Sequence, residues 1–227
     1  MNSTRLAIII AVVLLLATGC GKPASTPPPT SGLFSIQSFN HIDDRTQYDF
    51  TLELPAGFQK GEISIECTAK AVLEGRKVLV LDWELDVTKE FKDVTSTSTV
   101  LIKVWATADG EIVQGEVRGE AKSGTGIERY LVIPYLASRQ LSPGDRFTIS
   151  GASLGESKIE LIAGGIESVS TPAGTFSAMR LTASGSLDLT IYVSPEVPGG
   201  IIKLDMEKGG ERGEVRSIVL TSYNDAT

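Results

Sequence analysis

The feature that most limits the fold is a period-two alternation of apolar and polar residues, repeated in many short runs. In LVLDWELDV, residues 79–87, five apolar side chains alternate with positions that include three acidic ones. The runs LDLTIYV (187–193), IIKLDM (201–206) and EVRSIVLTSY (214–223) repeat the pattern or add β-branched residues. Such alternation buries one face of an extended chain and leaves the other in water, which predicts antiparallel β-strands.

Turn signals separate these runs. Asp109-Gly110 lies between two strand-like segments and is a strong hairpin signal. Gly75 divides two further apolar runs. SPGD, residues 142–145, fits a type II turn, because proline fixes φ at the second position and glycine accepts a positive φ at the third. The spacing of these signals predicts short strands joined mainly by tight turns.

Helical periodicity is scarce. The best candidate is YLVIPYLASRQL, residues 130–141, where Pro134 leaves at most a short helix in the second half. We therefore expect an all-β, mainly antiparallel fold of about 10–12 strands with little helix. A curved sheet, a half-barrel and a sandwich all satisfy this pattern. A soft boundary at residues 119–128, GEAKSGTGIE, is expected to be a loop between two halves of one domain.

The N-terminal segment has the form of a secretory signal. Arg5 precedes an unbroken apolar stretch, residues 6–17, which is shorter than the roughly 20 apolar residues that a spanning helix needs. After Cys20 the chain is rich in proline and small residues, a composition that forms a semi-rigid spacer. The expected organisation is a signal peptide at 1–19, a lipidated cysteine and spacer at 20–32, and a β-rich extracytoplasmic domain at 33–227.

Residues 16–20, LATGC, resemble the lipobox of bacterial lipoproteins. In that family the cysteine thiol receives a diacylglyceryl group and the chain is cut before it. The usual leucine stands three residues before the cysteine, whereas here Leu16 is one step earlier. The resemblance implies lipidation of Cys20, a membrane as partner through that lipid, and a place on the extracytoplasmic face of the cell membrane or outer membrane. The alternative is an ordinary cleaved signal with an incidental cysteine.

Charge and cysteine content exclude several classes of partner. The chain has 28 acidic and 21 basic residues and a net charge of −7. Nucleic-acid binding needs a positive surface for phosphates, so no nucleic-acid partner is expected. The second cysteine, Cys67, has no disulfide partner if Cys20 is lipidated. The alternation in ISIECTAKA predicts one buried face made of Ile63, Ile65, Cys67, Ala69 and Ala71.

One motif suggests a hydrolase. GASLG, residues 151–155, matches the G-x-S-x-G nucleophile elbow around Ser153. That elbow needs a helix after the serine and a later histidine, but the next residues are strand-like and the sole histidine, His41, lies upstream. One histidine and one free cysteine also cannot build a transition-metal site, and nucleotide-binding glycine motifs are absent. We expect no catalytic residue, no metal, no cofactor and no enzyme activity.

Residues 164–206 contain TPAGTF, AMRLT and LDLTIYVSPEVPGGIIKL in that order. This order resembles the TapB-like and related uncharacterised bacterial envelope proteins. The resemblance implies a β-rich fold, which in some members is the half-barrel of lipoprotein-carrier proteins such as LolA and LolB. The chain departs from the family at Tyr192, where many members have tryptophan. The residues expected to form structural turns in this segment are Pro172, Gly174, Pro195, Gly199 and Gly200.

The expected function follows from strands that are apolar on both faces. Such a sheet must be covered on both sides, and little helix is available to cover it. A rolled sheet can leave room for one small ligand. We therefore expect a non-enzymatic binding or carrier module for an apolar, lipid-like ligand. The alternative is a structural or protein-interaction lipoprotein of the cell envelope, with a filled core and an envelope protein as partner.

Overall fold

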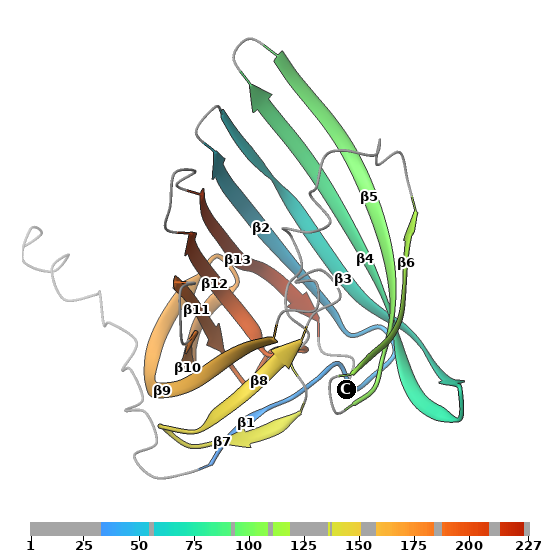
Figure 1. The fold of residues 1–227 in the computed structure, drawn as a ribbon, viewed down its shortest axis with the longest axis vertical. Helices are drawn as coiled ribbons and strands as arrows, with labels where there is room; N and C mark the ends of the chain where they lie inside the picture. Colours follow the sequence, from blue (N-terminus) through green and yellow to red (C-terminus); the bar gives the residue numbers. More distant parts are fainter. Residues whose placement is uncertain are drawn as a thin grey trace, which may run out of the picture. The chain divides into compact units, whose positions relative to one another are not determined.

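Every regular element in the described part of the chain is a β-strand (Figure 1). The structure, a computed structural model, describes residues 33–54, 57–91, 94–108, 111–118, 136, 138–150, 158–183, 188–208 and 214–224. Its thirteen strands are β1 (Phe34–Ile36), β2 (Arg45–Leu54), β3 (Gly57–Leu73), β4 (Arg76–Phe91), β5 (Val94–Ala106), β6 (Ile112–Arg118), β7 (Arg139–Leu141), β8 (Arg146–Ser150), β9 (Lys158–Thr171), β10 (Gly174–Ala183), β11 (Asp188–Val193), β12 (Ile201–Lys208) and β13 (Glu214–Asn224). The predicted all-β fold class is confirmed.

Eleven strands form one antiparallel sheet in the order β6-β5-β4-β3-β2-β13-β12-β11-β10-β9-β8. Two meanders, each made of sequential neighbours, meet where β2 pairs with β13. The sheet ends at β6 and β8, so it is open rather than closed into a barrel. The remaining two strands, β1 and β7, form a separate antiparallel pair (Figure 1). No helix among the described residues is long and apolar enough to cross a membrane.

The strand β7 lies where the sequence predicts at most a short helix, in the second half of residues 130–141. Phe34 pairs with Leu141 and Ile36 pairs with Arg139, so this stretch is extended. The apolar spacing there is compatible with a helix or a strand. Pairing with β1, more than a hundred residues earlier in the chain, stabilises the strand. Of the rest of that candidate, Leu136 is buried in the core.

A bulge in β3 changes which side chains face the core. Cys67 pairs with Leu81, but Ala69 pairs with Val80, so one extra residue lies in β3. Because facing residues on antiparallel strands share a side, Ala69 leaves the face on which Cys67 lies. The prediction that Ala69 and Ala71 continue the buried face of Cys67 is therefore wrong. The next alternate positions, Lys70 and Val72, turn to the inner face instead.

Cys67 itself is fully buried, and burial together with the nearby Asp44 carboxylate raises the pKa of its thiol. We expect a thiol reagent to label Cys67 at least about 100-fold more slowly in the folded protein than in concentrated guanidinium chloride, since labelling requires local or global opening. The Cys20→Ser chain makes Cys67 the only thiol for this measurement. Equal rates in the two conditions would contradict the buried position.

Buried apolar residues from both meanders and from β1 form one contiguous core. Tyr48 lies in it with its hydroxyl donating to the Ile201 carbonyl at 3.0 Å, so the buried polar atom is satisfied. The segment after β1 packs over the β11–β12 connection. There Phe39 and Ile36 contact Gly199 and Gly200, where an added Cβ would collide with them.

The predicted turn residues lie in or next to connections between strands. Pro172 and Gly174 lie at the β9–β10 turn. Pro195, Gly199 and Gly200 lie in the β11–β12 connection, where both glycines have a positive φ, 75° and 78°. A further turn sits between β7 and β8, where the Asp145 amide donates to the Ser142 carbonyl at 3.0 Å and Gly144 has φ 95°. Glycine suits these positions because other L-residues are strained there.

Several sequence predictions lie outside the described residues. These are the signal segment with Cys20, the elbow-like motif with Ser153, the hairpin signal Asp109-Gly110, and the boundary at residues 119–128.

Candidate functional site

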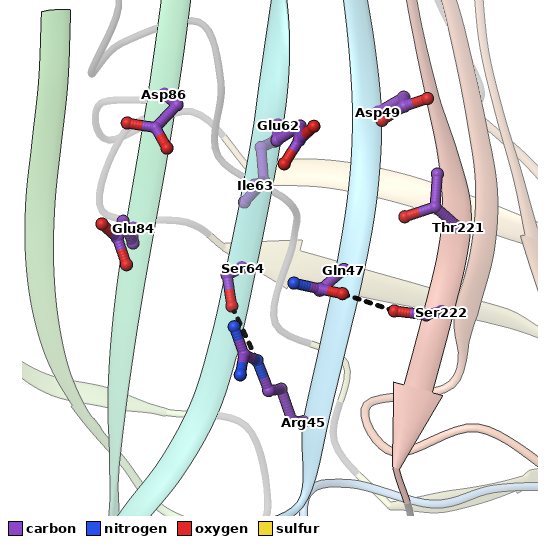
Figure 2. A pocket seen from close by; sticks show the side chains of 10 residues that line it. All are labelled: Arg45, Gln47, Asp49, Glu62, Ile63, Ser64, Glu84, Asp86, Thr221 and Ser222. Carbon is purple, nitrogen blue, oxygen red and sulfur yellow. Dashed lines mark hydrogen bonds between the residues drawn. The ribbon is translucent and has the colours of Figure 1, made fainter.

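Two hollows of similar size lie on the main sheet, and they differ in chemistry. The first, here the polar hollow, has a volume of about 570 Å³ and is shown in Figure 2. It spans β13, β2, β3 and β4 on the face away from the core. Its lining is polar apart from one isoleucine: Arg45, Gln47, Asp49, Glu62, Ile63, Ser64, Glu84, Asp86, Thr221 and Ser222.

Three carboxylates form a row across the polar hollow. Asp49 pairs with Glu62 across β2 and β3, and Glu62 pairs with Asp86 across β3 and β4. All three side chains are exposed, and Thr99 donates to Asp86 at 2.6 Å. In the described part of the chain, no three or more His, Cys, Asp or Glu residues form a group that could hold a metal ion. The row is thus an exposed acidic face of the sheet.

Like charges directly opposite one another destabilise a sheet, so Glu62→Lys should stabilise this protein. The substitution turns two repulsive neighbours, Asp49 and Asp86, into attractive ones. We expect the free energy of unfolding to rise by about 1 kcal/mol at low salt and by less at high salt, because salt screens exposed charges. Urea unfolding at two salt concentrations measures this.

The control for that substitution is Glu196→Lys, which makes the same charge change at an exposed turn position between β11 and β12. Equal stabilisation by both variants would assign the effect to net charge rather than to the carboxylate row.

The second hollow, here the end hollow, has a volume of about 540 Å³ and lies at the β3–β4 hairpin end of the sheet. Its lining is mainly apolar: Phe39, Asn40, Lys70, Ala71, Val72, Lys77, Val78, Leu79 and Ala108. Glu74 and Gly75 make the hairpin turn with φ of 50° and 77°, values typical of a type I′ turn. The bulge at Cys67 brings Lys70 and Val72 onto the inner side of this hairpin.

A buried carboxylate fixes the loop that supplies Phe39 and Asn40. Asp44 Oδ2 accepts the backbone N–H groups of Asn40 and His41, each at 2.7 Å. The same loop is tied to β3, because the Asp43 amide donates to the Cys67 carbonyl at 2.8 Å and the Cys67 amide donates to the Asp44 carbonyl at 2.9 Å. One wall of the end hollow is thus held in place by backbone hydrogen bonds.

The two lysines of the end hollow differ from others on the sheet. Lys60, Lys103 and Lys203 each lie within 3.1 Å of a carboxylate oxygen. Within the described residues, Lys70 and Lys77 have no acidic group in ion-pair range. Lys77 pairs with Val72, and Lys70 pairs with Leu79. The cross-strand neighbour of each lysine is therefore an apolar side chain. The end hollow therefore combines an apolar floor with two lysines that form no ion pair among the described residues.

Of the chemical groups weighed from the sequence, His41 and Cys67 lie among the described residues, and their side chains have different partners. The side chain of His41 is half exposed, with Nδ1 3.7 Å from Asp44 Oδ1. The Cys67 thiol faces the Ala69 carbonyl at 3.9 Å and is buried. Sequence reasoning missed Lys70 because nothing in AKAVLEGRKVLVL shows the bulge that turns it inward, and it missed Lys77 because the alternation of β4 was not followed past Leu79.

Comparisons with known proteins are sparse. No protein-family model matches the sequence, and no curated protein is similar to it, so the TapB-like resemblance of residues 164–206 remains a prediction from the quoted motifs. One similar solved structure is a β-barrel-like protein of a domain of unknown function (DUF1849) from Brucella abortus. It shares 10% identity over 83% of this chain and 98% of its own, with a TM-score of 0.49.

Two further solved structures are more distant. One, from Bacteroides fragilis, is provisionally described as an exported protein with a YmcC-like fold; it has 11% identity, a TM-score of 0.36, and coverage of 84% of this chain and 100% of its own. The other, from Parabacteroides distasonis, is provisionally described as a lipoprotein; it has 10% identity, a TM-score of 0.35, and coverage of 86% and 100%.

Proposed function

We propose that this chain is a non-enzymatic binding module that holds an amphiphile, with an apolar body and an anionic end, in the end hollow. The observation that carries the proposal is the apolar lining beside two lysines that form no ion pair with a described acidic residue. A ligand that is only apolar would not interact with the two lysine charges. A small polar anion would leave the apolar lining of the hollow exposed to water.

The dimensions and the walls support this function. Ligand sites are commonly hollows of about 300–1,000 Å³, mostly apolar, with a few placed polar groups. The end hollow lies in that range and has this composition. Its walls are a regular hairpin and a loop fixed by Asp44, so the site is formed before a ligand arrives and little ordering entropy is lost on binding.

The proposed setting is the extracytoplasmic face of a membrane, through a lipid on Cys20. A short apolar run, a lipobox-like LATGC and a proline-rich spacer support it. We expect radiolabelled palmitate to enter the full chain in a bacterial host and to be lost in Cys20→Ser. Equal label in both chains would contradict the anchor, whatever the function of the end hollow.

The test of binding uses a photoactivatable fatty acid added to membranes that contain the full chain. We expect saturable labelling within residues 39–40 and 70–79, displaced by unlabelled fatty acid. Val72→Asp should reduce labelling about tenfold or more, because it puts a carboxylate on the apolar floor. Its matched control is Val117→Asp, since both valines are exposed, 70% and 53%, but Val117 lies on β6 away from the hollow.

The charge of the ligand is tested separately. Replacing Lys70 and Lys77 together by alanine should weaken labelling by the fatty acid but not by the matching fatty alcohol, which has no charge. Lys60→Ala, at the other end of β3, is the control and should change neither. Labelling that does not saturate, or that ignores both Val72→Asp and the double lysine variant, would overturn the proposal.

A protein-interaction role is the second candidate. The observation that favours it is a length of β5, at one edge of the sheet, with which no described strand pairs on the outer side.

A further inference from the structure

The strand β5 is longer than its outer neighbour β6. Pairing between them covers Leu101–Ala106 of β5 and Ile112–Arg118 of β6. On its other side β5 pairs with β4 along its whole length, from Val94 to Ala106. In the described part of the chain, no strand pairs with residues 94–100 on the side away from β4, and Figure 1 shows this part of β5 extending past β6.

The sequence of this open stretch is a palindrome. Residues 94–100 read VTSTSTV, the same in both directions about Thr97. Five of its seven side chains are exposed. Edge strands are usually protected from pairing by lysine, proline, bulges or inward charges. This stretch contains no charged residue and no proline, and its pairing with β4 is regular.

We propose that two copies of this chain join along residues 94–100 of β5, antiparallel, about a twofold axis at Thr97. That axis stands perpendicular to the sheet, so each face of one copy continues the same face of the other. The palindrome then matches like with like: Thr97 meets Thr97 of the second copy, Thr95 meets Thr99, Ser96 meets Ser98, and Val94 meets Val100. Hydroxyl pairs of this kind stabilise neighbouring strands.

The alternation of β5 fixes the register of this contact. Thr95, Thr97 and Thr99 lie on the polar face, opposite Glu90, Thr88 and Asp86 of β4. Val100 lies on the other face and is buried. A register shift of one residue would pair the threonines of the polar face with residues of the opposite face. A shift of two residues would separate Val94 of one copy from Val100 of the other.

The length of the contact is bounded on both sides. β6 begins its pairing opposite Leu101, so a second copy can occupy seven positions, about 23 Å of strand. A second copy placed about this axis pairs every residue of the stretch with one of its own type, a match that an unrelated peptide would not gain from the palindrome. The contact is small compared with stable interfaces of about 1,200–2,000 Å², so association is weak and is best trapped covalently. It does not depend on the end hollow or its ligand.

The first test is disulfide trapping with the full chain in membranes. Thr97→Cys should give an intermolecular disulfide under mild oxidation, because residue 97 faces itself at a Cα separation of about 4.5–5.5 Å. Thr95→Cys alone should not, since the two copies of residue 95 are offset by about 13 Å along the strands. Chains with Thr95→Cys and chains with Thr99→Cys should cross-link when they are mixed. The unmodified chain, with Cys67 buried, gives the background.

The second test exchanges charge at the axis, with two differently tagged copies of the full chain and co-purification as the readout. Thr97→Lys alone and Thr97→Glu alone should each lose co-purification through like-charge repulsion, and the two together should restore it. Circular dichroism checks that each variant is folded. Equal cross-linking by Thr95→Cys and Thr97→Cys, or co-purification that survives Thr97→Lys, would overturn this pairing.

Discussion

Gly61→Ala should be the most damaging single-methyl change in this sheet. Gly61 lies within β3 between Phe50 of β2 and Val87 of β4. An added Cβ would overlap the backbone carbonyl oxygen of Asp86 and lie 3.0 Å from Cε1 of Phe50. The oxygen belongs to the β4 backbone and cannot move without breaking the ladder. We expect a loss of more than about 3 kcal/mol in the free energy of unfolding, or failure to fold.

The matched control for Gly61→Ala is Gly115→Ala. Gly115 also lies within a strand, β6, but an added Cβ there meets nothing within 4 Å. Alanine costs less backbone entropy than glycine, so this variant should be neutral or more stable by a few tenths of a kcal/mol. Urea unfolding midpoints at equal slope compare the three chains. An unchanged midpoint for Gly61→Ala would mean that β3 and β4 do not approach as closely as the structure shows.

The strands themselves were accessible from the sequence, because their cause is local. The alternation in residues 79–87 predicts the centre of β4, and Gly75 marks the turn that divides β4 from β3. SPGD at 142–145 similarly predicts a turn with a positive φ at Gly144. In each case the strand or turn is determined by residues close together in the sequence: by an alternation of side chains, or by a glycine that can adopt a positive φ.

The order of the strands was not accessible, because its cause is long-range. β2 pairs with β13, more than 150 residues later, and that pairing joins the two meanders into one open sheet. The alternation only requires that a partner exist, and it does not say which strand supplies it. A curved sheet, a half-barrel and a sandwich therefore remained equally compatible with the same pattern.

The end hollow depended on a feature that the alternation cannot show. Without the bulge, Ala69 would continue the face of Cys67, and Lys70 would point to the solvent side. The extra residue between Cys67 and Ala69 reverses this and puts Lys70 beside Leu79 on the inner face. A bulge depends on both strands of a pair, so β3 alone contains no signal for it. The acidic row, in contrast, contains one carboxylate from each of three neighbouring strands, and their register brings these carboxylates together.

Asp44→Ala should both destabilise the protein and disturb the end hollow. The Asp44 side chain is 2% exposed, and its Oδ2 accepts two backbone N–H groups, from Asn40 and His41, at 2.7 Å each. Alanine would leave both donors without this acceptor in a partly buried place. Each hydrogen bond to a charged group contributes about 1.5–3 kcal/mol, so we expect a loss of about 3–5 kcal/mol.

Asp44→Asn separates the two roles of this carboxylate. Its amide oxygen can still accept from both N–H groups, so the loop keeps its shape, and the loss should be about 1–2 kcal/mol because the charge is gone. Asp188→Ala, at an exposed position of β11, should change stability by less than about 0.5 kcal/mol.

The Asn40 and His41 amides should also exchange their hydrogens faster in Asp44→Ala than in Asp44→Asn. Since this loop supplies Phe39 and Asn40 to the end hollow, fatty-acid labelling should fall in Asp44→Ala under conditions where the chain is still folded, and should persist in Asp44→Asn. Unchanged exchange at Asn40 and His41 in the alanine variant would show that the loop is held by other contacts.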